Sequence, residues 1–135
     1  MARTPITTKR ELYSDFFTDF MENPVSEDLA RVTNEEAVKQ SLKYLLLTDK
    51  GERPFRPNLG ADIRRMLFEN ITPATIITAR ESIRETISAY EPRINVMDID
   101  IRASADENRV TISIVFTVIN SEREILFTTT LSRVR

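Results

Sequence analysis

The hydrophobic pattern of this chain changes its period once, at Glu91-Pro92-Arg93. Before that point apolar residues recur at helical spacing, and after it they alternate with polar residues. Side chains on one face of a helix repeat about every 3.6 residues, whereas those on one face of a strand repeat every second residue. The pattern therefore predicts an α+β fold, in which three helices precede a three-stranded antiparallel sheet and pack on one of its faces.

Three helices are expected before the change of period. Thr33-Asn34-Glu35-Glu36 fits a capping box, and an amphipathic pattern follows it to about Thr48. A shorter helix is expected within residues 58–70. The third begins at Thr72-Pro73, with Thr72 as the N-cap and Pro73 at the first helical position, and ends before Glu91.

Three strands are expected after the change. In the first, Met97, Ile99 and Ile101 alternate with polar residues and are predicted to face the core. The second strand covers residues 110–118, and the third, which is rich in Thr, covers residues 125–131. Short polar segments between them are typical of hairpin connections.

The first 32 residues have no clean period and gather their aromatic side chains between positions 12 and 21. We expect residues 1–32 to form an N-terminal arm that is partly extended, and residues 33–135 to form one domain, a size that a single core supports. The aromatic rings either complete that core or anchor the arm to another molecule, and both readings are open. Neither a signal peptide nor a membrane span is expected.

The residue types that most compact enzyme sites require are missing. The chain contains no His, no Cys and no Trp, and only two Gly. Without His and Cys there is no Ser-His or Cys-His catalytic pair, no zinc site and no disulfide, and two glycines do not make a phosphate-binding loop. We therefore expect no cofactor, no metal and no small-molecule substrate.

The charge balance gives no general attraction to polyanions. Nineteen Lys and Arg face 21 Asp and Glu, for a net charge of -2. A protein that binds nucleic acid or an anionic membrane usually carries a basic surface. We expect neither nucleic acid nor a membrane among the partners.

Three segments, in this order and spacing, carry a family resemblance: Lys50-Gly51-Glu52-Arg53-Pro54-Phe55, Leu67-Phe68-Glu69-Asn70-Ile71-Thr72-Pro73 and Tyr90-Glu91-Pro92-Arg93-Ile94. Together they resemble the baseplate wedge subunit of T-even-type contractile phage tails, a sheath-initiator family also called tail lysozyme-like. The resemblance covers roughly residues 33–135. It implies a non-enzymatic structural protein of the virion, assembled in the host cytoplasm, that links other baseplate wedge proteins to the first ring of tail sheath subunits.

The resemblance also implies that the sheet offers an edge to extended arms of the sheath subunits. Unpaired strand edges recruit other strands through main-chain hydrogen bonds. We expect the last strand to be that edge, and the alternative is a central strand that is paired on both sides. The residues expected to pair are Ile125, Phe127, Thr128, Thr129, Thr130 and Leu131.

Two further segments are candidate partner contacts. The resemblance implies that Glu91, Pro92 and Arg93 face the helical core bundle of neighbouring wedge proteins, although a helix stop with an internal Glu-Arg pair fits the residues equally well. Arg53 and Phe55 have the composition of an interface anchor. For Phe55 the sequence slightly favours packing of the ring under its own loop.

Two alternative functions are compatible with the sequence. A peptidoglycan-degrading tail lysozyme needs two carboxyl groups roughly 5 to 9 Å apart, one with a raised pKa. Glu52, Asp62, Glu69 and Glu91 are candidates, but among 21 acidic residues some pair meets any spacing, and no Trp is present to stack on a sugar. The second alternative is the equivalent baseplate component of a bacterial contractile injection system.

Overall fold

The computed structural model describes residues 14–16, 31–104, 106–119 and 121–133, and the chain divides into two compact units, Met1–Val38 and Lys39–Arg135. In the first unit, strand β1 (Ser14–Phe16) pairs antiparallel with β2 (Arg31–Thr33). Most of the expected N-terminal arm lies outside the described residues. The predicted boundary between arm and domain stays a prediction.

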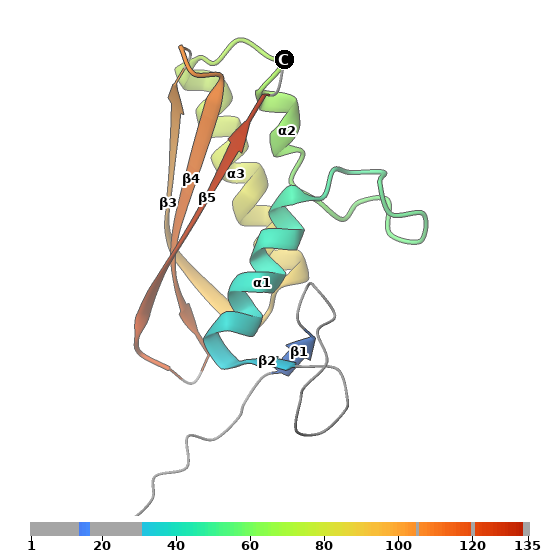
Figure 1. Cartoon of the computed structure of the whole chain (residues 1–135), viewed down its shortest axis with the longest axis vertical. Helices are drawn as coiled ribbons and strands as arrows, with labels where there is room; N and C mark the ends of the chain where they lie inside the picture. The colour runs from blue at the N-terminus through green and yellow to red at the C-terminus, as the bar shows by residue number, and fades with distance from the viewer. Residues whose placement is uncertain (1–13, 17–30, 105, 120, 134–135) are drawn as a thin grey trace, which may run out of the picture. The chain divides into compact units, whose positions relative to one another are not determined.

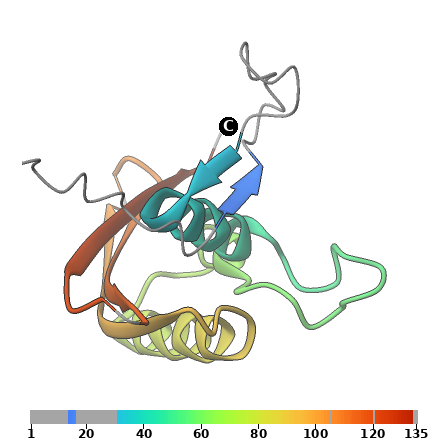
Figure 2. The ribbon, with the colours of Figure 1, turned by 90° about the horizontal axis from the view of Figure 1, so that it is seen from below.

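The second unit has the predicted architecture. Helix α1 (Asn34–Leu47) enters it, and α2 (Ile63–Met66) and α3 (Pro73–Tyr90) follow. Strands β3 (Ile94–Ser104), β4 (Arg109–Val118) and β5 (Glu124–Ser132) then form one antiparallel sheet in the order β3-β4-β5. Figures 1 and 2 both show α1 and α3 on the same face of this sheet. The predicted α+β fold, with helices before strands, is confirmed.

The core lies between the helices and the sheet. Strand β4 buries every second residue, and Phe116 near its end lies opposite Val96 of β3 and Ile125 of β5. Each fully buried aliphatic or aromatic side chain contributes roughly 1.5–3 kcal/mol. The fully buried side chains of this unit are Leu42, Leu46, Ile63, Ile83, Ile87, Ile99, Val110, Ile112, Ile114 and Phe116.

Helix α3 begins as predicted. Pro73 is its first residue, and the Thr72 hydroxyl accepts a hydrogen bond from the Thr75 amide at 3.3 Å. Towards its end the helix buries Thr86, whose hydroxyl donates to the carbonyl of Ser82 at 2.7 Å and lies 3.2 Å from that of Gly60. This hydroxyl ties α3 to the segment that follows α1.

The second helix is much shorter than predicted, since it covers only Ile63–Met66. The backbone before it is left-handed at two positions, with φ +127° at Gly60 and +53° at Asp62. A positive φ does not continue the backbone path of a right-handed helix. The helix therefore starts only after Asp62.

The prediction that Met97 faces the core is wrong. The register between β3 and β4 shifts between Val96 and Asp98, so Met97 has no partner residue on β4 and its side chain is 56% exposed. A β-bulge adds one residue to a strand and reverses the alternation beyond it. Ile99 and Ile101 are buried as predicted.

Candidate protein-interaction surfaces

Strand β5 lies at an edge of the sheet. It pairs with β4 without a register shift, and it pairs with no other strand in the part of the chain that the structure describes. The alternative of a central β5 is therefore wrong. Figure 1 shows the strand in red along the border of the sheet.

The main-chain groups of β5 alternate in direction. The Arg133 amide donates to the Asn108 carbonyl at 2.9 Å, which marks these two residues as a hydrogen-bonded pair. In an antiparallel ladder such pairs alternate with pairs that make no bond. By this alternation Thr129 bonds β4, whereas the amides and carbonyls of Leu126, Thr128 and Thr130 point away from β4 and form the free edge.

The residues predicted to pair with sheath therefore fall into two groups. Thr128 and Thr130 direct main-chain groups outward, while Ile125, Phe127, Thr129 and Leu131 direct theirs to β4. Three of the latter four side chains are buried on the helix-covered face, and Thr129 is partly exposed. The edge is thus formed by main chain on a strand whose apolar side chains, apart from Leu126, are held in the core.

Beside this edge, most side chains on the face of the sheet opposite the helices are small and polar. The hydroxyls of Thr111 and Thr130 lie 3.4 Å apart across β4 and β5, and those of Ser113 and Thr128 lie 3.3 Å apart. Leu126, 62% exposed, is the large apolar exception on β5. Short hydroxyl side chains leave the outward main chain accessible to an extended peptide.

The turn after α3 is held by an internal ion pair. Glu91 is 2% exposed, and its carboxylate accepts two bonds from Arg93, at 2.6 Å from Nε and 2.8 Å from Nη2. The Ser41 hydroxyl of α1 donates to the same carboxylate. Pro92 between them is exposed. Of the two sequence readings, the internal pair is present in the structure, and a partner contact by Glu91, Pro92 or Arg93 stays a prediction.

The environment of Glu91 favours its charged form. Burial raises the pKa of this carboxyl, but the hydrogen bonds from Arg93 and Ser41 and the positive charge of Arg93 outweigh burial, so its pKa lies below the ordinary value of 4.5. Bidentate Arg–carboxylate pairs are among the stronger polar interactions in proteins. Glu91 therefore braces the junction of α1, α3 and β3.

A braced loop between α1 and α2 presents Phe55. The ring is 97% exposed, so the expectation that it packs under its own loop is wrong. Across the base of the loop the Gly51 amide donates to the Pro57 carbonyl at 2.8 Å, and the Lys50 amide donates to Asp62 Oδ1 at 2.9 Å. Arg53 is also exposed. The loop is visible in Figure 1 as the excursion away from the helices.

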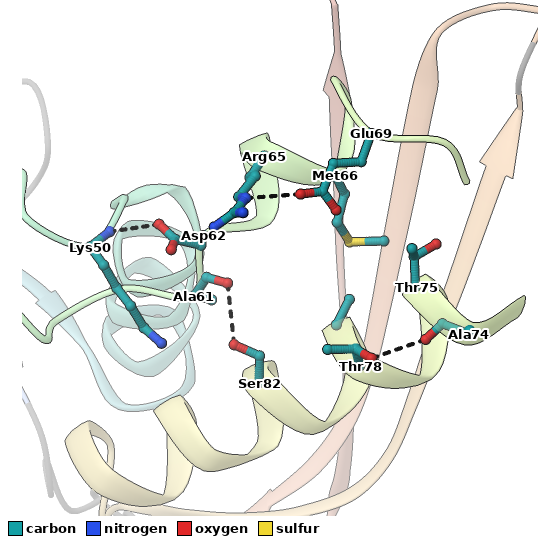
Figure 3. A pocket seen from close by; sticks show the side chains of 11 residues that line it. Lys50, Ala61, Asp62, Arg65, Met66, Glu69, Ala74, Thr75, Thr78 and Ser82 are labelled. Carbon is teal, nitrogen blue, oxygen red and sulfur yellow. Dashed lines mark hydrogen bonds and ion pairs between the residues drawn. The ribbon is translucent and has the colours of Figure 1, made fainter. Parts of the chain in front are cut away.

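An open groove of about 420 Å³ lies between α2 and α3 (Figure 3). Asp62 and Glu69 lie on its rim, and each is engaged locally, Asp62 by the Lys50 amide and Glu69 by Arg65 Nε at 2.8 Å. Small-molecule sites are mostly apolar and enclosed, with a few polar groups free for the ligand. This groove is open rather than enclosed, and its two carboxylates are already bonded to local donors.

The candidate carboxylates of a lysozyme site are engaged in structural hydrogen bonds. Glu52 accepts from the Asp49 amide at 3.0 Å, while Asp62, Glu69 and Glu91 have the partners described above. A glycosidase requires a general acid with a raised pKa, and the buried carboxyl, Glu91, has a lowered one. Among the described residues, no three His, Cys, Asp or Glu side chains gather into a possible metal site. Within the same residues, no helix has the length and apolarity to cross a membrane.

Comparison with known proteins identifies the family. The family model for baseplate wedge protein gp25 matches residues 32–123. The baseplate wedge protein gp25 of Enterobacteria phage T4 is 34% identical over 115 residues, which cover 85% of this chain and 86% of that protein.

Two solved structures share the fold at 25% identity. A suspected tail lysozyme from Geobacter sulfurreducens superposes with a TM-score of 0.66 over 75% of this chain and 92% of its own. A chain of the anti-feeding prophage baseplate superposes with a TM-score of 0.62 over 90% of this chain and 87% of its own. From the family-model match and the identity to the phage T4 protein, the chain belongs to the gp25 family of baseplate wedge proteins.

Proposed function

We propose that this structural protein of the virion tail baseplate links the wedge to the first ring of tail sheath and initiates sheath assembly by strand pairing at the β5 edge. The observation that carries the proposal is the outward main chain of Leu126, Thr128 and Thr130 on an unbroken edge strand. An extended arm of a sheath subunit would add to the sheet as a fourth strand beside β5.

Three features of β5 support strand addition. It pairs with β4 without a register shift along Arg109–Thr117, its buried side chains Ile125, Phe127 and Leu131 anchor it in the core, and its hydroxyl side chains leave the edge open. Proteins that block an edge use Pro, Lys or a bulge. Within the described β5 (Glu124–Ser132) none of these three occurs.

The alternating direction of the main-chain groups of β5 allows a specific test of strand pairing. Thr130→Pro removes one outward amide and leaves the bonds to β4 intact, and edge strands tolerate such a proline. Thr130→Ala is the matched control, because it removes the same hydroxyl and keeps the amide. Baseplates that carry Thr130→Pro should nucleate sheath at least tenfold less often in electron micrographs, and the control should behave as wild type. Normal nucleation with Thr130→Pro would reject pairing at this edge.

The wedge-facing surface is proposed to include the turn after α3 and the loop that presents Phe55. Pro92 is exposed and Arg93 is partly exposed, so both would form part of the surface that meets a helical bundle of neighbouring wedge proteins, while the buried Glu91 orients Arg93. Phe55, with Arg53 in the same loop, supplies an aromatic anchor of the kind enriched in interface hot spots.

Phe55→Ala tests the loop without disturbing the fold, because the ring buries almost nothing in the isolated chain. Phe68→Ala is the matched control, since Phe68 is also exposed, at 68%, and lies outside the loop. Co-purification with the other wedge proteins should fall severalfold for Phe55→Ala only, at an unchanged melting temperature. An equal loss for both variants would remove Phe55 from the interface.

The protein is proposed to have no catalytic activity, in contrast to a tail lysozyme. The carboxylates that a glycosidase would use are bound to local donors, and the buried one has a lowered pKa. Purified protein should release no soluble fragments from peptidoglycan. Release that disappears in Glu69→Gln or Glu91→Gln would establish the enzyme instead.

A further inference from the structure

Among the described strands β3 pairs with β4 alone, so it forms the second edge of the sheet, and its ladder is interrupted. The register with β4 shifts between Val96 and Asp98, which leaves Met97 as the extra residue of a bulge. A bulge bends an edge strand and breaks the even row of main-chain groups that a second strand needs. The β5 ladder has no such shift.

The bulge is followed by an outward amide that is already bonded. The Ile119 amide donates to the Arg93 carbonyl at 2.8 Å, and this bond fixes which β4 residues face β3. By the alternation of the ladder, Asp98 bonds β4 and the amide of Ile99 points outward. That amide donates to Asp98 Oδ1 at 2.9 Å. A strand arriving beside β3 therefore finds the first outward donor after the bulge occupied.

The same edge also carries charge. Asp98 is exposed, and Asp100 is bound to Arg102 at 2.7 Å on the same strand. Charged side chains on an edge strand oppose the approach of another strand, because pairing would desolvate them. On β5, by contrast, the residues at the outward positions between the strand ends are Leu126, Thr128 and Thr130.

We infer that the Met97 bulge and the Asp98 carboxylate close the β3 edge against pairing with a second copy of this chain. With both edges open, two copies could join β3 to β3 about a two-fold axis, as isologous dimers do. With β3 closed, β5 is the single open edge of the described three-stranded sheet. The sheet can then accept an added strand beside β5, and it accepts none beside β3.

Two changes open the β3 edge without altering the core. Asp98→Ala frees the Ile99 amide, and deletion of Met97 removes the bulge. The deletion joins Val96 to Asp98, so that the run from Ile94 to Ile101 alternates strictly and every apolar residue keeps its face. Asp100→Ala is the matched control, because it removes one charge from the same strand without freeing an edge amide.

Sedimentation velocity of the full chain over a concentration series measures the outcome. Wild type and Asp100→Ala should sediment as monomers, and the double variant should approach twice the monomer mass as concentration rises. Asp98→Ala alone should associate more weakly than the double variant. Asp98→Asn, which keeps an acceptor oxygen, should remain monomeric.

Proline substitutions then locate the contact. In the double variant, Ala103→Pro removes an outward β3 amide and should abolish association, whereas Thr130→Pro on β5 should not. A folded double variant that stays monomeric, association that survives Ala103→Pro, or a wild-type dimer that Ala103→Pro dissolves would each overturn the inference. Circular dichroism verifies folding, and if the deletion fails to fold, Asp98→Ala alone decides.

Discussion

Gly60 occupies a position that no other residue fits. Its φ is +127°, and a Cβ atom there would lie 2.3 Å from the Thr48 carbonyl oxygen. Gly60→Ala combines left-handed strain with a backbone clash and should cost about 3 kcal/mol of unfolding free energy. Gly51→Ala, at φ +86° with nothing within 4 Å of the Cβ, should cost only about 1 kcal/mol. Urea unfolding of both variants checks this, and equal losses would contradict it.

Glu91 links stability to pH. Because its pKa in the fold lies below the ordinary value of 4.5, its contribution is fully present above that value and is lost as pH falls through the folded pKa. Glu91→Gln should cost about 2 kcal/mol at pH 7 and should flatten the loss of stability below about pH 4.5. The exposed Glu69→Gln is the control. Urea unfolding at several pH values tests both variants. If the unfolding free energy of Glu91→Gln fell below pH 4.5 as steeply as that of wild type, Glu91 would not be the group that links stability to pH.

At the scale of an element, adjacent threonines of β5 have opposite roles in the ladder. Thr129 lies in a bonded pair with Ile112, and Thr130 lies in the next, unbonded pair with Thr111. Thr129→Pro removes a ladder bond and should lower the unfolding free energy by about 2–3 kcal/mol, while Thr130→Pro should cost about 1 kcal/mol or less. Thermal unfolding followed by circular dichroism separates them. If Thr130→Pro were more destabilising than Thr129→Pro, the hydrogen-bonded pairs between β4 and β5 would lie one residue away from the assigned ones.

The elements differ in how far local sequence determines them. Helix α3 is predictable because Thr72-Pro73 is a strong start and Pro92 a strong stop, and β4 because it alternates without interruption. The bulge at Met97 is not predictable, since Met97 itself continues the alternation of Ile99 and Ile101 and only pairing with β4 reveals the shift. The late start of α2 is not predictable from a local pattern, since it follows positive φ angles at Gly60 and Asp62, and Gly60 contacts Thr48 and Thr86 from other segments.

At the scale of the whole molecule, the surfaces depend on contacts between distant residues. The order β3-β4-β5 decides which strands are edges, and the alternation of apolar and polar residues within each strand does not determine that order. The bond from Ser41 to Glu91 joins residues 50 positions apart, so no local pattern signals it. Glu91 is a candidate from its motif, but its role as an internal brace follows only from the fold. The exposure of Phe55 likewise reflects a loop held at its base.

The two proposed contacts of the molecule should respond differently to salt. A net charge of -2 gives no long-range field, so electrostatic attraction to wedge proteins depends on local groups such as Arg53 and Arg56 beside Phe55. Raising salt from about 0.1 M to 1 M shortens the screening length from about 10 Å to about 3 Å and weakens exposed charge pairs. Main-chain pairing at β5 involves no ionic group.

Incorporation into wedges should therefore fall severalfold over this range, and a variant with both Arg53→Ala and Arg56→Ala should start lower and lose most of its salt dependence. Pairing of the β5 edge with a synthetic peptide that copies a sheath arm should change less than twofold. Fluorescence anisotropy of the peptide and co-purification of the wedge measure the two. Equal salt sensitivity of both contacts would show that charges on the uncovered face of the sheet, rather than main-chain groups, govern β5 binding.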